Sequence, residues 1–398
     1  MTRPAPRGAR ARAPSHWLAQ VAGGAAATPP APARLPESAE VVVVGGGVMG
    51  VATAFWLARL GADVLLVESR RLAWGASGRN GGFMLGGHAS LDLARTVLRE
   101  EGIEADYDEP GHLALASSPA TLDEMRGEVA ARPPTAAEVR VIERGACEEL
   151  LGRPLDARFL GGRWMPRAAT IHPARFVYGL AAAAARRGAV IAQETAVLSV
   201  ERARRGDAAA VETRRGRIRA RHVVVACNAE TGRLLPPLRR VLTPARGQVL
   251  ASRPLPSLFR VGLAVDWGTV YWRQAADGVI VLGGYRNLDR PAETTAREAL
   301  NPRIQAALAR FLPESFPGLP AVAVGRRWAG IMDVTPDEMP VVGAWPEGSG
   351  TWVIAGFGGH GLPPALGAGR ALAEAIVRGT RAAELDRFDP ARFAKALG

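Results

Sequence analysis

The chain has 398 residues, a hydrophobic fraction of 48% and a formal net charge of +12, so we expect two domains with ample core. No run of about 18 apolar residues occurs, which argues against an integral membrane segment. Two distant cysteines indicate neither a disulfide framework nor a metal site, and dispersed arginines with few interleaved aromatic residues argue against nucleic-acid binding.

The first 36 residues are rich in alanine, proline and arginine, which predicts a disordered arm. Their arginines resemble those of a transit peptide, but the prolines would break an amphipathic helix and no apolar core of a secretory signal follows. We therefore expect a cytoplasmic protein with a solvated arm. Within this arm, the alternative for the segment 15–18 is that it docks locally on the folded protein.

A strand, a glycine turn and a helix follow the arm. Four valines at 41–44 indicate a buried strand, and Gly45, Gly47 and Gly50 form the turn before a helical pattern over 51–60. Glycines at these positions let a pyrophosphate approach the free amides at the start of the helix. The pattern predicts a dinucleotide site.

The context of this turn favours that interpretation over an ordinary strand, turn and helix. Ala54 allows close packing of the helix on the sheet. A second strand over 63–67 ends at Glu68, whose carboxylate can accept hydrogen bonds from ribose hydroxyls. The glycine-rich segment 74–82 comes next, and we expect it to lie close to the ligand, the alternative being a flexible surface loop.

The rest of the chain alternates between two groups of elements. Strands from residue 111 onward indicate a second domain. A helix over 173–187 and the apolar run 223–225 indicate a return to the first domain. Strands at 247–252, 270–274 and 279–284 then indicate a second departure from it. In the strand 270–274, Tyr271 and Arg273 share one face and Trp272 takes the other. The last return is a strand at 352–355, a glycine turn at 356–361 and a helix over 365–378.

Together these segments resemble one known family. The residues GGGVMG at 45–50, VES at 67–69, WGASGRNGG at 74–82, VVVACNA at 223–229, TPDEMPVVG at 335–343 and GFGGHG at 356–361 carry the resemblance. They resemble the FAD-dependent D-amino-acid oxidase superfamily, and GASGRNGG is most similar to its gamma-glutamylputrescine oxidoreductase branch.

The resemblance implies a mixed α/β (α+β) fold with two interleaved domains. A Rossmann-like FAD-binding domain would comprise residues 37–110, 168–240 and 325–398. It would be interrupted by a substrate domain with a large mixed or antiparallel sheet, at residues 111–167 and 241–324.

The resemblance also implies which residues contact FAD. They lie in the first glycine turn, at the acid after the second strand, in the loop near the flavin, at one adenine contact and at the start of the last helix. They are Gly45, Gly47, Val48, Met49, Gly50, Glu68, Ser69, Ala76, Ser77, Arg79, Asn80, Gly81, Gly82, Val197, Gly356, Gly359, His360, Gly361 and Leu362. The start of the last helix would favour negative charge on the flavin.

The chain departs from the family pattern at several positions, and these departures bear on how FAD and the substrate are bound. Gly330 stands where sarcosine oxidases attach flavin through cysteine, and 74–82 contains no histidine, so we expect non-covalent FAD. Pro363 and Met332 stand where relatives use a lysine or an arginine for the substrate carboxylate, which makes Met332 a candidate substrate residue. Leu282 is aligned with the oxygen-activating lysine.

The sequence therefore predicts an FAD-dependent oxidoreductase that oxidises a C–N bond, with hydride transfer to flavin N5 and hydrolysis of the imine. The expected substrate is a primary or secondary amine such as a gamma-glutamylputrescine-like compound, with oxygen or another electron acceptor. His360, Tyr271 and Arg273 are the catalytic candidates, with loop packing or ordinary sheet positions as alternatives. Rival functions are a glycine, sarcosine or D-amino-acid oxidase or dehydrogenase, an NAD-dependent dehydrogenase, and a non-catalytic flavin-binding protein.

Overall fold

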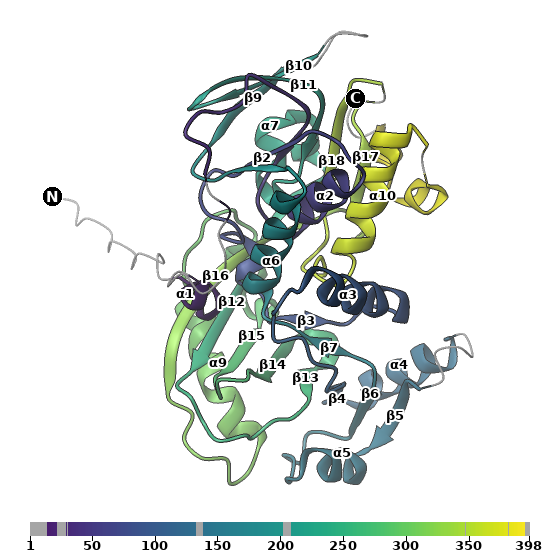
Figure 1. The fold of residues 1–398 in the computed structure, drawn as a ribbon. Helices are drawn as coiled ribbons and strands as arrows, with labels where there is room; N and C mark the ends of the chain where they lie inside the picture. The colour runs from purple at the N-terminus through teal and green to yellow at the C-terminus, as the bar shows by residue number, and fades with distance from the viewer. Residues whose placement is uncertain are drawn as a thin grey trace, which may run out of the picture.

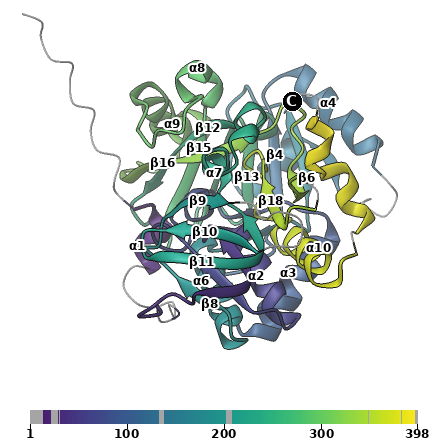
Figure 2. The same ribbon diagram turned by 90° about the horizontal axis from the view of Figure 1, so that it is seen from above.

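The computed structural model describes residues 14–21, 29, 31–132, 138–201, 208–346, 348–380 and 382–394. Two eight-stranded sheets dominate these residues, one in the upper and one in the lower half of the molecule (Figure 1). In the view from above, strands β9, β10 and β11 of the first sheet lie in front of the second sheet (Figure 2). The expected mixed α/β architecture is confirmed.

Five neighbouring strands of the first sheet are parallel. Its order is β17 (Val341–Ala344), β18 (Thr351–Ala355), β11 (Gly216–Val225), β1 (Ser38–Val44), β2 (Val64–Val67) and β8 (Val190–Ala192), with β10 (Ala209–Thr213) and β9 (Val197–Glu201) attached to β11. Strand β1 is parallel to both neighbours, with Val42 paired to Val223 and to Leu65. Apolar clusters cover both faces of this sheet, which explains its nearly continuous apolar strands.

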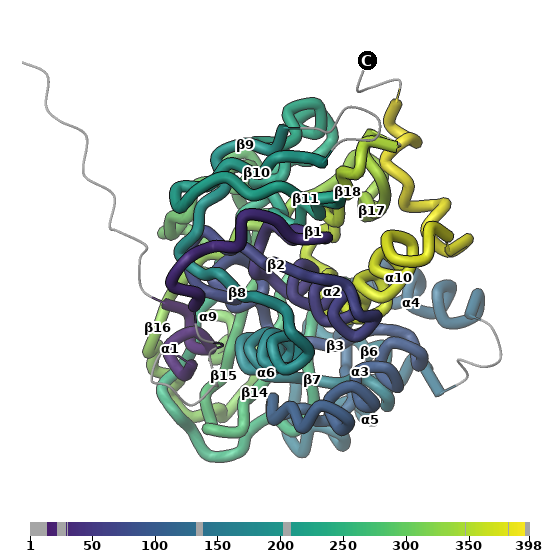
Figure 3. Tube along the Cα trace, turned by 45° about the horizontal axis from the view of Figure 1, so that its top comes forward, coloured from purple at the N-terminus to yellow at the C-terminus, as the bar shows by residue number. Residues whose placement is uncertain are grey.

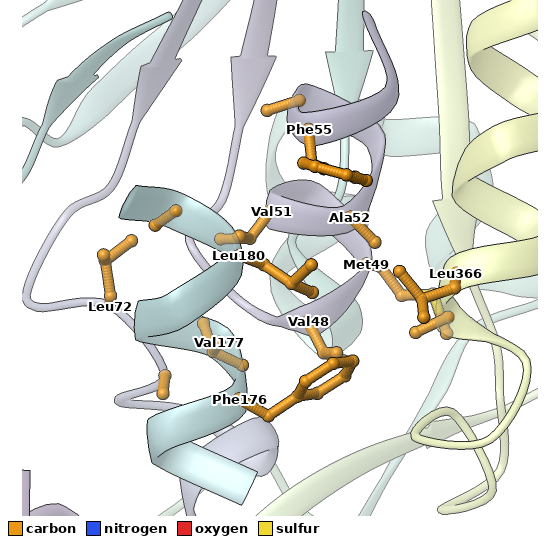
Figure 4. Packing of buried hydrophobic residues seen from close by; sticks show 14 of the residues in the cluster. Val48, Met49, Val51, Ala52, Phe55, Leu72, Phe176, Val177, Leu180 and Leu366 are labelled. Atoms are coloured by element: carbon orange, nitrogen blue, oxygen red, sulfur yellow. The ribbon is translucent and has the colours of Figure 1, made fainter. Parts of the chain in front are cut away.

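Helix α2 (Val48–Arg59) lies against α6 (Pro173–Arg186) and α10 (Ala365–Arg378). Figure 4 shows Val48 beside Phe176, and Met49 beside Leu366. Residues 48–58 are all buried, so this helix is apolar on every side. Gly369 permits the closest approach, since a Cβ there would lie 2.9 Å from the backbone of α2.

The second sheet extends below the first. Its order is β16 (Val324–Val334), β12 (Thr243–Ser252), β15 (Ile280–Gly284), β14 (Val270–Gln274), β13 (Gly262–Val265), β4 (His112–Ala116), β6 (Gly161–Met165) and β5 (Arg140–Glu143). Only the pair of β4 and β13 is parallel among these described pairings. One face packs on α9 (Pro302–Ser315) through a core that includes Trp272, Leu282 and Phe311.

The remaining α-helices and strands complete the described structure. They are α1 (His16–Val21), β3 (Phe83–Met84), α3 (His88–Glu101), α4 (Pro119–Ala130), α5 (Arg144–Leu151), β7 (Ala169–Thr170), α7 (Thr231–Leu234) and α8 (Arg290–Glu293). No helix of the described ranges combines the length and apolar character that crossing a membrane requires.

Two expected boundaries differ from the structure. Strand β16 was expected in the FAD-binding domain, which was to resume at residue 325, but it pairs with β12 along its length from Val324 to Val334. The chain therefore returns to the first sheet only after residue 334. Within the expected disordered arm, residues 16–21 form helix α1 with a buried Trp17, while residues 1–13, 22–28 and 30 lie outside the described residues.

Candidate functional site

Three loops emerge at neighbouring strand ends of the first sheet. Residues 45–50 follow β1, residues 76–82 follow β2 at a distance, and residues 356–362 follow β18. Ligands of open α/β sheets bind at the carboxyl ends of parallel strands. This edge is therefore the place where a cofactor would lie.

The first turn leaves no room for side chains. A Cβ on Gly45, which has a φ of 114°, would lie 2.5 Å from the carbonyl oxygen of Ala226. A Cβ on Gly50 would lie 1.9 Å from the carbonyl oxygen of Gly45. Gly47 begins helix α2 without a side-chain cap, so the positive end of the helix faces a cradle suited to a pyrophosphate.

The neighbouring loops fix this turn. Ser77 Oγ accepts a hydrogen bond from Val48 N at 2.8 Å, which ties the loop 76–82 to the start of α2. Glu68 Oε2 accepts from Gly46 N at 2.7 Å, and Glu68 Oε1 accepts from Arg70 N and from Ser69 Oγ. Glu68 lies directly after β2, at the position expected for ribose recognition.

In the loop 76–82, two polar side chains turn toward the protein. Arg79 is 2% exposed, and it donates to the carbonyl oxygens of Trp74 at 2.8 Å and Ala329 at 3.1 Å. Burial lowers the pKa of Arg79, against the opposing charge of Glu298 at 3.5 Å. Asn80 donates to the carbonyl oxygens of Ala76 and Ser77. Both side chains shape the loop, so its backbone remains as the surface for a ligand.

A buried acid holds the second glycine turn. Asp333 is 2% exposed, and its Oδ2 accepts a hydrogen bond from Gly356 N at 2.7 Å while its carbonyl oxygen accepts from Gly358 N at 2.9 Å. Burial raises the pKa of Asp333 to about 6, although backbone hydrogen bonds act in the opposite direction. Asp333 was missed in the sequence, where a single acid within an apolar strand next to a glycine turn was the available signal.

Two methionines pack against the same turn. A Cβ on Gly359, which has a φ of 89°, would lie 2.6 Å from Met332 Sδ, and a Cβ on Gly361 would lie 3.1 Å from Met49 Cε. Leu362 is buried, whereas His360 is exposed. Met332 and Met49 thus each pack against one glycine of the turn, and the His360 side chain is exposed to solvent.

Tyr271 and Arg273 on the second sheet both lie against the site, but Arg273 has a different role from the one expected. Tyr271 lies over Gly283 and Gly81, where a Cβ would approach its ring to 2.5 Å and 3.0 Å respectively, and burial raises its pKa to about 12. Arg273, 5% exposed, donates to the carbonyl oxygens of Gly81 at 2.9 Å and Ile171 at 2.8 Å. Arg273 therefore supports the loop from behind.

Leu282 and Val197 are two further positions that the resemblance singles out. Leu282 belongs to the core between the second sheet and α9, so it faces away from the loop 76–82. Its neighbour Gly283 lies under Tyr271 instead. Val197 begins β9, and its carbonyl oxygen accepts a hydrogen bond from Arg233 at 2.9 Å. The adenine contact expected there stays a prediction.

Several side chains that contact the site are not indicated by the sequence motifs. Ser15, Trp17 and Trp328 donate hydrogen bonds to the loop 76–82, and Asn228, at a φ of 51°, donates to the carbonyl oxygen of Ile331 at 2.7 Å. These contacts join residues far apart in the chain, and the sequence indicates only that the segment 15–18 docks locally, not what it contacts. Among the described residues, no cluster of acids, histidines or cysteines could hold a metal.

Comparisons with known proteins agree with this geometry. Residues 40–375 match the model of a family described as FAD dependent oxidoreductase. The chain is 30% identical to a probable oxidoreductase OrdL of Rhizobium meliloti, over 85% of this chain and 83% of that protein. It is 28% identical to gamma-glutamylputrescine oxidoreductase of Escherichia coli, over 88% and 85% of the two chains.

Solved structures show the same fold. Glycine oxidase from Geobacillus kaustophilus superposes with a TM-score of 0.78 at 22% identity, covering 89% of this chain and 98% of that one. The chain spans about half the length of the mitochondrial dimethylglycine dehydrogenases that it also matches. Because the family model matches most of its length and the glycine turn after β1 has the geometry of a dinucleotide site, the chain belongs to the FAD dependent oxidoreductases of the D-amino-acid oxidase superfamily.

Proposed function

We propose that this protein oxidises the C–N bond of a primary or secondary amine that carries no carboxylate on the carbon nearest the flavin. One observation carries the proposal: the thioether of Met332, rather than a cation, lies against the second glycine turn. The arginines on the neighbouring segments, Arg79 and Arg273, donate to protein carbonyl oxygens. A substrate carboxylate buried here without a partner would cost several kcal/mol.

The chain would bind and orient the amine through apolar and aromatic surface. Phe83 packs edge-on against Tyr271 with ring centroids 6.0 Å apart, and Met332 lies on the side of the second glycine turn. Such surroundings disfavour an ammonium ion by desolvation, so they favour the neutral amine that can lose a hydride. FAD, when bound, supplies the two-electron acceptor, and the protein supplies orientation and exclusion of water.

A longer amino compound is the substrate class that we favour. The similarity to gamma-glutamylputrescine oxidoreductase supports an amine whose carboxylate lies several bonds from the reacting carbon. We also propose that FAD is bound without a covalent link, because Gly330 offers no attachment atom and residues 74–82 contain no histidine. Flavin that stays with the protein after acid precipitation would contradict this second point.

Anaerobic reduction of the purified flavoprotein tests the substrate class. We expect putrescine derivatives acylated on one nitrogen to bleach the flavin band faster than glycine, sarcosine or D-alanine at equal concentration. Faster bleaching by the small amino acids would overturn the carboxylate argument. A flavoprotein that none of these compounds reduces would contradict amine oxidation itself.

Variants at Met332 sharpen this test. Met332→Arg introduces the cation that the argument says is missing, so reduction by small α-amino acids should rise relative to reduction by the amine. Met332→Leu keeps the position apolar and is the matched control, with the preference for amines retained. An unchanged preference in Met332→Arg would show that this position does not face the substrate.

The electron acceptor needs a separate experiment. Comparing the rate at which air and an artificial dye reoxidise the reduced flavoprotein distinguishes oxygen from another electron acceptor.

A further inference from the structure

Five consecutive carbonyl groups of the loop 76–82 are held by donors from outside the loop. Each of residues 78–82 has its carbonyl oxygen bonded to a donor outside the loop. The donors are, in order, Ser15 Oγ, Trp328 Nε1 at 2.9 Å, Trp17 Nε1 at 2.8 Å, Arg273 Nε at 2.9 Å and Ile171 N at 2.8 Å.

This arrangement decides where the amides of the loop point. In a trans peptide the carbonyl and the following N–H group point in opposite directions. Arg79 N donates to the carbonyl oxygen of Ala76, and Gly82 N donates to Asn80 Oδ1. The N–H groups of Asn80 and Gly81 find no acceptor among the described residues, and they follow two of the held carbonyls. The Asn80 N–H therefore points away from Trp328 and the Gly81 N–H away from Trp17, and both remain available to a ligand.

Two of the five donors come from helix α1 and the residue before it. Ser15 Oγ also accepts from Leu18 N at 3.1 Å, so one hydroxyl both caps the helix and holds the loop. Trp17 is 1% exposed, and the guanidinium of Arg273 lies 4.8 Å from its ring. Figures 1 and 3 show α1 beside β16 and α6, at the boundary of the two sheets.

A chain of side chains fixes α1 in this place. His172 Nδ1 accepts from Arg175 N at 3.1 Å, so Nε2 carries the proton and donates to Gln20 Oε1 at 2.8 Å. Gln20 Nε2 then donates to Asp277 Oδ2 at 2.6 Å, and His16 Nε2 lies 3.0 Å from the same oxygen. A helix of six residues is too short to be stable alone, so these contacts hold it.

We propose that Trp17 and Ser15 are positioning residues of the flavin site. Trp17 holds the carbonyl of Asn80 and so orients the N–H group of Gly81 toward the bound flavin, while Ser15 holds the carbonyl of Gly78 and caps the helix that carries Trp17. The N-terminal segment is then part of the cofactor site. Its role rests on FAD binding and is independent of the substrate, so failure of the proposed amine oxidation would leave it intact.

The variant Trp17→Phe tests the proposal, since it keeps a ring under Arg273 and removes the donor to Asn80. Ser15→Ala removes the donor to Gly78, and Ser15→Thr restores a hydroxyl. The matched control is Trp352→Phe, whose indole donates to His222 Nδ1 at 3.3 Å in the first sheet. Titration of each apoprotein with FAD gives the dissociation constant, and hydrogen exchange of the peptide spanning 76–82 reports the order of the loop.

We expect Trp17→Phe and Ser15→Ala each to weaken FAD binding by about fivefold to twentyfold, corresponding to the loss of one buried hydrogen bond. Exchange in 76–82 should accelerate in the apoprotein, and Ser15→Thr and Trp352→Phe should match the wild type in both measurements. FAD affinity and loop exchange that stay unchanged in the folded Trp17→Phe and Ser15→Ala proteins would overturn the proposal. If Trp17→Phe does not fold, the Ser15 pair decides the outcome.

Discussion

Replacing Asp333 with asparagine should stabilise the protein in a way that depends on pH. The pKa of this carboxyl is raised by burial from 3.8 to about 6, so the folded protein holds its proton more tightly than the unfolded chain. The contribution of the protonated Asp333 carboxyl to the free energy of unfolding is fully present below pH 3.8 and is lost as the pH rises through 6. At about 1.4 kcal/mol per pH unit, the ionised form costs roughly 3 kcal/mol above pH 6, and roughly 2 kcal/mol of this develops between pH 4.5 and 7.5.

Asparagine mimics the neutral carboxyl, because its side-chain oxygen can still accept from Gly356 N. We therefore expect Asp333→Asn to gain stability over wild type by roughly 2 kcal/mol more at pH 7.5 than at pH 4.5. Urea unfolding of both apoproteins at the two pH values measures this, and every other titrating group cancels in the difference. A difference between the proteins that does not change with pH would refute the reasoning.

Asp337 supplies the matched control within the same segment. A hydrogen bond from Arg392 lowers the pKa of Asp337 to about 2, so its stabilisation is fully present above pH 3.8 and is lost only as the pH falls toward 2. Asp337→Asn should therefore show no pH trend between 4.5 and 7.5. A trend like that of Asp333→Asn would mean that the two substitutions act through something other than the carboxyl that each removes.

Three other predictions concern separate parts of the fold. Gly50→Ala should abolish FAD uptake because its Cβ would meet a backbone oxygen, whereas Gly127→Ala, in an open position of α4, should leave the flavin spectrum unchanged. Burial lowers the pKa of His172 to about 3, so this residue alone should contribute a loss of about 1.4 kcal/mol per pH unit as the pH falls below 6.5, and the difference in urea unfolding between wild type and His172→Asn should show that slope. Glu293→Ala should cost about 3–5 kcal/mol of unfolding free energy because it leaves Arg246, 2.7 Å away, charged and unpaired, while the flavin spectrum of the folded fraction stays normal.

The parts of the molecule that the sequence predicts well depend on local pattern. The valines 41–44 and the glycines that follow specify strand, turn and helix within 20 residues, and the structure has all three. Strand periodicity likewise separates Trp272, in the core against α9, from Tyr271 and Arg273 on the other face. In both cases the backbone period alone determines which side chains share a surface.

The parts that the sequence misses depend on partners distant in the chain. Helix α1 has too few residues for a periodic signal, and its stability comes from residues 78, 172 and 277. The sequence makes Arg273 a catalytic candidate because it shares a sheet face with Tyr271. Its role as support for the loop follows only once Trp17 and Gly81 lie against it. The same holds for β16, whose pairing with β12 outweighs its proximity in sequence to the last return.

The three glycine-rich loops share one physical arrangement. Gly46 N is held by Glu68, Val48 N by Ser77, the carbonyls of 78–82 by donors behind the loop, and Gly356 N by Asp333. Each loop is fixed by protein groups, so its conformation does not depend on the ligand. Glycine provides close approach but also the greatest loss of backbone entropy on ordering. Because distant side chains order these glycines during folding, little of that entropy loss remains to oppose FAD when it binds.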